Sequence, residues 1–167
     1  GLGIVSSTSV LAALKRIERY SSVVSTNGRF LLVQHEGLTS LEVRRTEPTV
    51  APIPEYVDAT VVAVCRMLRL CAGPAATPLE VRLPDRHNAP AAPYREALGC
   101  AVKFGTENVA IVFDAQVAAR PVLSGNPELA AEADKISLRY LEGLLPESTA
   151  ARVRPPLPTA MPSGHIE

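Results

Sequence analysis

The segment Asp85-Arg86-His87 is the compact polar cluster of this sequence in which an acid/base pair could be assembled. General acid/base catalysis needs such a side chain within hydrogen-bond reach of the transferred proton, and nucleophilic catalysis needs a serine or cysteine beside the base. None of the three histidines, His35, His87 and His165, lies in a recognisable catalytic signature. The cluster follows a predicted strand and precedes a proline, where polar turn residues are common. A turn is therefore the favoured interpretation, and a small hydrolase-like enzyme that uses Asp85 and His87 is the alternative.

Arg66 and Arg69 lie in a segment that is otherwise apolar. Either their guanidinium groups extend along the segment to reach water, or they enter a cavity and bind the carboxylate of a ligand. The first interpretation is favoured, and the second makes both residues candidates for effector binding.

Tyr94, Phe104 and Phe113 all lie in the segment 93–115, PYREALGCAVKFGTENVAIVFDA. They fit either a packed core, which is favoured, or the lining of a small-molecule pocket, which is largely apolar with a few polar groups.

The three cysteines form no Cys-x-x-Cys pair, and no Cys/His cluster has the spacing of metal ligands. Buried free thiols in a reducing cytoplasm are favoured, and an effector-sensing thiol is the alternative. No catalytic residue, metal site or cofactor is predicted. The candidate effector-binding residues are Arg66, Arg69, Cys65, Tyr94, Phe104 and Phe113.

The elements that would position these residues follow from apolar periodicity, capping residues and turn residues. Helices are predicted over 9–24, 55–72, 90–98 and from 127 to near 146, and strands over 29–34, 41–44, 79–83, 101–104 and 109–113. The first two strands and the last two are each predicted to form a β-hairpin. The helix 55–72 has apolar residues nearly all round, which predicts a central position, although its β-branched run 60–64 makes a strand the competing interpretation.

The predicted order is α-β-β-α-β-α-β-β-α, which favours an α+β domain with a mainly antiparallel sheet and packed helices. A parallel crossover is expected only around the second helix. One domain is predicted over 1–145, and the proline-rich segment 146–167 is predicted to be a linker or tail.

The composition excludes several classes of function. The 167 residues carry 17 basic and 17 acidic side chains and no net charge, whereas domains that bind nucleic acid through its phosphates are usually basic. Apolar runs are shorter than the ~20 residues of a membrane span, so we expect a soluble protein with no membrane partner. No signal peptide is visible, and a start inside an apolar stretch suggests that a segment upstream is missing.

One pattern of residues resembles a known family. The positions His87-x-x-Pro90, Tyr94, Leu98-Gly99, Val102-x-Phe104-Gly105, Asn108, Phe113 and Pro121 resemble the effector-binding region of AraC/XylS-type bacterial transcription regulators. The similarity is to the branch whose N-terminal region is called the arabinose-binding-like domain, as in regulators resembling OruR, VirS and VqsM. It covers about 1–145. Leu98 replaces the family's usual phenylalanine and Ala101 its common proline.

The resemblance implies an effector-binding and dimerisation domain, with a DNA-binding domain of two helix-turn-helix motifs missing from this chain. The implied partners are a small-molecule effector and DNA, the latter only through the missing domain; a homodimer is possible. We expect the effector to bind between the helix 55–72 and the sheet, because this nearly all-round apolar helix still carries Arg66 and Arg69. The resemblance implies no catalytic residues. A ligand-free dimerisation module, with the helix stripe 129–144 as its interface, is the alternative.

Overall fold

The computed structural model describes residues 1–24, 28–45, 53–86 and 89–144. His87 and the predicted linker 146–167 lie outside the described residues. The boundary predicted at residue 145 lies outside them as well.

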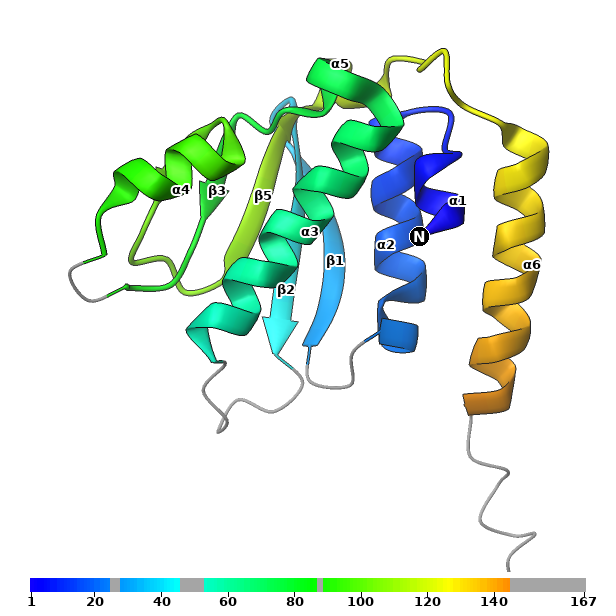
Figure 1. The fold of residues 1–167 in the computed structure, drawn as a ribbon, viewed down its shortest axis with the longest axis horizontal. Coiled ribbons are helices and arrows are strands. Elements are labelled where there is room, and N and C mark those ends of the chain that lie inside the picture. The colour runs from blue at the N-terminus through cyan, green and yellow to red at the C-terminus, as the bar shows by residue number, and fades with distance from the viewer. Residues whose placement is uncertain (25–27, 46–52, 87–88, 145–167) are drawn as a thin grey trace, which may run out of the picture.

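A five-stranded sheet forms the centre of the fold (Figure 1). Its spatial order is β1-β2-β5-β3-β4, and every neighbouring pair is antiparallel except β3 and β4. The predicted α+β class with a mainly antiparallel sheet is confirmed. The strands are β1 (Gly28–His35), β2 (Leu38–Arg45), β3 (Glu80–Arg82), β4 (Ala101–Lys103) and β5 (Val109–Asp114).

The helices match the sequence pattern closely, and two of their ends show why. The Asn126 side chain accepts a hydrogen bond from the Leu129 amide at the start of α6, and Gly99 ends α4 in the left-handed conformation with φ 67°. The short helices α1 and α5 and the 3-10 turn η1 were not predicted. The helical elements are α1 (Leu2–Val5), α2 (Val10–Val24), α3 (Pro54–Ala72), η1 (Gly73–Ala76), α4 (Ala91–Leu98), α5 (Ala115–Ala119) and α6 (Pro127–Leu144).

The first predicted hairpin is confirmed, with a tighter turn than the loop 35–40 suggested. His35 pairs with Leu38, so only two residues connect β1 and β2. Both have positive φ, 48° at Glu36 and 77° at Gly37, as in the primed turns whose twist suits a hairpin. The two-residue turn was not predicted from the sequence, because glutamate, here Glu36, rarely adopts positive φ.

The second predicted hairpin is wrong. β3 lies between β4 and β5, so the two strands that flank Gly105 do not pair with each other. Instead β3, α4 and β4 form a parallel crossover, away from the helix where we expected one. The intervening segment is long enough for such a connection, which needs a dozen or more residues. Thr106 then donates its amide and hydroxyl hydrogens to the Leu83 carbonyl and holds the return segment against the end of β3.

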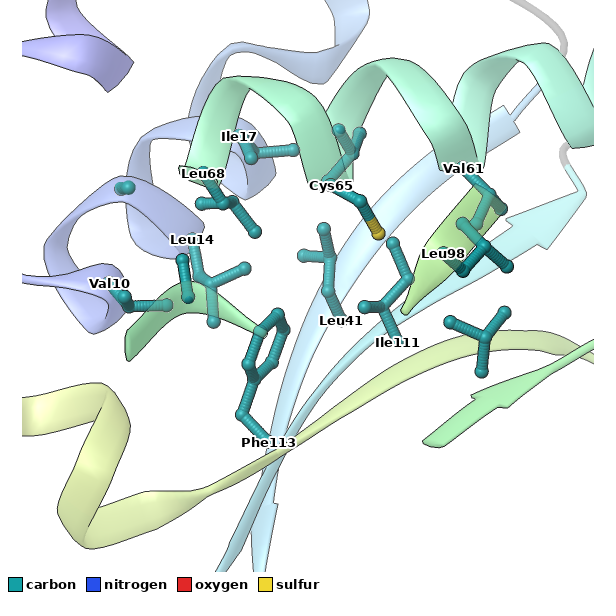
Figure 2. Packing of buried hydrophobic residues seen from close by; sticks show 14 of the residues in the cluster. Val10, Leu14, Ile17, Leu41, Val61, Cys65, Leu68, Leu98, Ile111 and Phe113 are labelled. Atoms are coloured by element: carbon teal, nitrogen blue, oxygen red, sulfur yellow. The ribbon is translucent and has the colours of Figure 1, made fainter. Parts of the chain in front are cut away.

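The core lies between the sheet and the helices α2 and α3, which cover one face of it (Figure 1). The register aligns Leu41 with Ile111 and Ile111 with Val81, so these side chains share that face. Figure 2 shows Leu41 and Ile111 on this face, beneath Cys65 of α3 and near Leu14 of α2. Five of the six residues of β5 are buried, as expected of a strand with a neighbour on each side.

The segment 55–72 is helical, so the competing strand interpretation is wrong, yet the helix is less enclosed than its composition suggests. Its buried positions are Val57, Val61, Val64, Cys65, Leu68 and Cys71. On the outer side Tyr56 is 54% exposed and Leu70 is 71% exposed. Because these exposed residues are apolar too, the sequence of the helix is apolar nearly all round. α3 therefore packs on the sheet through one face.

Candidate functional site

A pocket lies between α3 and α4, and we call it the α3–α4 pocket. Its volume is about 200 Å³. The two polar residues of its lining are Asp58 from α3 and Tyr94 from α4. The rest of the lining is apolar: Val61, Val62, Leu83, Pro93, Ala97 and Leu98. An apolar concave surface with a few polar groups is the usual form of a small-molecule site.

The polar residues of the pocket belong to a hydrogen-bonded group of three side chains. Arg86 donates from Nη2 to Asp58 Oδ1 at 3.0 Å, and the Tyr94 hydroxyl donates to Asp58 Oδ2 at 2.8 Å. Arg86 is 9% exposed and Asp58 27%. The pKa of Tyr94 is raised above its ordinary value. The hydrogen bond to Asp58 is the main cause, and burial is the second. The three side chains tie the segment after β3 to both helices.

The Tyr94 ring is fixed from a second side. Its centroid lies 5.2 Å from that of Phe104, and the ring planes meet at 86°, an edge-to-face arrangement. Such pairs contribute roughly 0.5–1.5 kcal/mol beyond their buried area. Phe104 therefore supports the wall of the pocket without being part of its lining.

The structure separates the other predicted site residues from the pocket. Arg66 is exposed on the outer side of α3. Arg69 donates from Nη2 to the Leu98 carbonyl at the end of α4, a common role for a basic side chain at a helix C-terminus. Cys65 and Phe113 are 1% and 2% exposed and belong to the core beneath α3 (Figure 2).

The Cys65 thiol is unsuited to chemistry. Burial raises its pKa to about 12, and the charge of Arg69 only partly opposes the increase. Because the thiolate is the reactive form of cysteine, this side chain behaves as a small apolar group of the core.

Sequence analysis missed the residue at the centre of the site. Asp58 stands one turn into a helix whose positions from 61 onward are apolar or arginine, and a carboxylate beyond the first-turn Glu55 of such a helix is the signal that could have found it. Arg86 appeared only as part of a turn. Of the proposed catalytic pair, Asp85 is exposed and His87 lies outside the described residues.

Two other site classes can be checked in the described part of the chain. Within residues 1–24, 28–45, 53–86 and 89–144, no group of three or more His, Cys, Asp or Glu side chains is arranged to hold a metal ion. In the same ranges no helix is both long and apolar enough to cross a membrane.

Comparison with solved structures shows the same fold in a known regulator. The crystal structure of the transcriptional regulator CdpR from Pseudomonas aeruginosa superposes with a TM-score of 0.55 at 13% sequence identity. The superposition covers 77% of this chain and 42% of that one.

Comparison of sequences shows the family. Residues 1–122 match the family described as the arabinose-binding domain of AraC transcription regulators, N-terminal. The HTH-type transcriptional regulator VirS of Mycobacterium tuberculosis, from strains CDC 1551 and H37Rv, is 30% identical over 155 residues. The alignment covers 85% of this chain and 44% of each VirS protein, so the chain spans less than half the length of these curated relatives. The resemblance found in the sequence is confirmed, and the chain belongs to the AraC-type transcription regulators through their N-terminal arabinose-binding domain.

Proposed function

We propose that this chain is the effector-sensing part of an AraC-type regulator and that the effector binds in the α3–α4 pocket. The observation that carries the proposal is the pocket itself, where Asp58 and Tyr94 are the polar groups of an otherwise apolar lining. In the proposed site Tyr94 lies in the wall of the pocket and Phe104 packs behind it, outside the lining. Arg66, Arg69, Cys65 and Phe113 have no place in the proposed site.

An effector between α3 and α4 would act by favouring one spacing of these helices. A ligand shifts a conformational equilibrium only as far as its affinities for the two states differ. α4 leads directly into β4 and is tied to α3 by Tyr94 and Asp58. Binding there would therefore bear on the sheet as well as on both helices.

We propose further that DNA contact belongs to a helix-turn-helix region, as the description of VirS as an HTH-type regulator indicates for that relative. This chain carries no net charge, whereas phosphate contacts require basic side chains, which supports placing DNA contact in a region other than this domain. Such a regulator would act in the cytoplasm and would not be an enzyme. Turnover of an ester or amide substrate that disappears in His87→Ala would overturn the non-enzymatic assignment.

The proposal is tested by a thermal-shift screen of this chain with neutral alcohols, amines, amino acids and fatty acids. Amide chemical shifts then locate each stabilising compound. We expect the changes to gather on residues 58–62 and 93–98. Stabilising compounds that leave both segments unperturbed and change another region would contradict the assignment of the pocket.

A specific observation favours dimerisation as a second candidate function. Leu129, Ile136 and Tyr140 of α6 are 40%, 59% and 57% exposed. Their spacing of seven and four residues places them on one side of the helix. If this stripe is a dimer interface, sedimentation velocity should show a dimer that Ile136→Lys dissociates. A monomer at high protein concentration would argue against it.

A further inference from the structure

The α3–α4 pocket is small, and it opens to solvent at α4, where Pro93 and Ala97 of its lining are exposed. Its volume is about 200 Å³, below the roughly 300–1,000 Å³ of common small-molecule sites. A cavity of roughly 150 Å³ is enough to hold benzene. The pocket therefore suits a molecule of about one ring, or a short branched chain of similar volume.

No cation lines the pocket in the part of the chain that the structure describes. Two of the arginines around it donate to other groups and one is turned away; Nε of Arg86 is buried without a hydrogen-bond partner among the described residues, but Arg86 is not part of the lining. Arg86 donates to Asp58, Arg69 donates to the Leu98 carbonyl, and Arg66 is exposed on the outer side of α3. A ligand carboxylate or phosphate would find no partner for its charge and would meet the Asp58 carboxylate instead.

The charge of Asp58 is already balanced within the protein. The nearly buried guanidinium of Arg86 lies 3.0 Å from it, and together they form a neutral pair. A second cation beside this pair would bring an unbalanced positive charge into a mostly apolar site, where desolvation is costly. The pair therefore disfavours amines as well as acids, and an uncharged ligand fits best.

The polar groups of the wall offer acceptors. A carboxylate has about four lone-pair sites, and Asp58 uses one for Arg86 and one for Tyr94. The Tyr94 hydroxyl gives its only proton to Asp58, so its oxygen can only accept from a ligand. The polar end of the ligand must therefore be a donor. A sugar fits poorly, because most of its hydroxyl groups would face apolar side chains without partners.

Building on the proposed function, we infer that the effector is a small uncharged molecule of about one ring with a single hydroxyl group, which donates to Asp58 or Tyr94. The rest of the molecule packs between α3 and α4. Acids, amines and sugars of the same size are not its natural ligands.

Four probes of nearly equal shape test this inference on the 167-residue chain at neutral pH: phenol, anisole, benzoate and benzylammonium. Amide chemical shifts of residues 58–62 and 93–98 give each dissociation constant. Phenol should bind most tightly. Anisole keeps the ring and lacks the donor, so it should bind about tenfold more weakly, the ordinary effect of one hydrogen bond to a charged group. Benzoate and benzylammonium should bind more weakly still.

The outcomes separate the inference from the proposed function. If benzoate, benzylammonium or anisole perturbs the pocket residues at lower concentration than phenol, the inferred ligand class is wrong and the pocket remains a binding site. If no probe perturbs these residues, both the ligand class and the proposed site are wrong.

Asp58→Asn gives an independent measurement. It keeps the shape of the side chain and leaves the charge of Arg86 unbalanced, so benzoate should gain at least about tenfold relative to phenol. An unchanged ratio in a folded variant would overturn the part played by the Asp58–Arg86 pair. Should the unbalanced arginine unfold the variant, the probe series on the parent chain still decides the question.

Discussion

Two contacts between helices in this fold each combine an arginine–aspartate ion pair with a neighbouring tyrosine, yet they differ in how completely they close. Between α2 and α6, Arg16 binds both oxygens of Asp134, at 3.1 and 3.0 Å. The Tyr20 hydroxyl is buried, and burial first and the charge of Asp134 second raise the pKa of Tyr20. A single bidentate ion pair therefore uses both oxygens of the aspartate. Its role is to attach α6, the outermost helix of Figure 1, to the body.

At the α3–α4 contact the same three residue types are bonded in a different way. Asp58 shares its two oxygens between Arg86 and Tyr94, so neither partner binds the carboxylate bidentately and acceptor sites remain. The surrounding residues leave a pocket of about 200 Å³. The lesson is that one set of side chains can fasten a helix or prepare a binding site, depending on how the aspartate oxygens are used and how closely the backbones approach.

The largest expected effect comes from adding a methyl group where the loop before α6 crosses the segment between α1 and α2, next to the closed contact. A Cβ at Gly125 would lie 2.7 Å from Thr8 Cα and 3.1 Å from the Ser7 carbonyl oxygen, so the backbone would have to move. We expect Gly125→Ala to lower the free energy of unfolding by about 2 kcal/mol, as overpacking commonly does. Urea unfolding measures it. Gly143→Ala in the open part of α6 is the control and should gain about 0.5–1 kcal/mol. Equal effects of the two substitutions would mean that the loop before α6 leaves room for a methyl group beside Thr8.

The ion pair of the closed contact comes next. Arg16 and Asp134 are 21% and 23% exposed, so solvent screens them only in part, and a double-mutant cycle should give a coupling of about 1 kcal/mol. Lys135 and Glu132, 66% and 64% exposed, form the control pair and should couple by no more than about 0.5 kcal/mol. Added salt should reduce the coupling. Two equal couplings would show that the bidentate geometry contributes nothing.

The open contact should respond to added atoms with the opposite sign. Val62 lines the α3–α4 pocket, and isoleucine keeps its branched shape while adding one methylene. We expect Val62→Ile to raise the free energy of unfolding by up to about 0.8 kcal/mol, the value of one buried methylene. Urea unfolding of Val62→Ile and Gly125→Ala under the same conditions compares their free energies of unfolding. A loss of more than about 1 kcal/mol would mean that the space is already filled.

The smallest effect is a pH dependence. The pKa values of Tyr20 and Tyr94 are raised above the ordinary tyrosine value of 10.0 in the folded chain. A group that binds its proton more tightly when folded stabilises the fold below its unfolded pKa, and this contribution is lost as the pH rises through the folded pKa. Stability should therefore fall above pH 10. Tyr94→Phe should flatten this slope, and an identical slope in the variant would contradict the assignment to Tyr94.

The sequence predicted the main helices well because their ends carry explicit signals. Asn126 and Gly99 are a capping side chain and a left-handed stop, and both act locally. The first hairpin was predictable for the same reason, since its strands are adjacent in the chain.

The pairing of β4 and the nature of the site could not be predicted in this way. β4 pairs with β3 across α4, and nothing in the two short apolar runs distinguishes that arrangement from a hairpin. The site depends on the meeting of Asp58, Arg86 and Tyr94, which lie 28 and 36 residues apart in the chain. Arg66 attracted attention through its apolar neighbours, but the helix turns it outward. Only the packing of α4 on α3 shows which charged residues lie close together at the pocket.

The measurement that tests the central claim most directly is the affinity of a stabilising compound for two matched variants of α4. Ala97→Trp adds a large side chain to the lining of the α3–α4 pocket, whereas Ala92→Trp adds the same side chain to the same helix outside that lining; both alanines are exposed. Isothermal titration calorimetry should show that Ala97→Trp weakens binding by roughly tenfold or more, a loss of about 1.4 kcal/mol, while Ala92→Trp leaves it unchanged. Undiminished binding in a folded Ala97→Trp variant would show that the effector binds elsewhere.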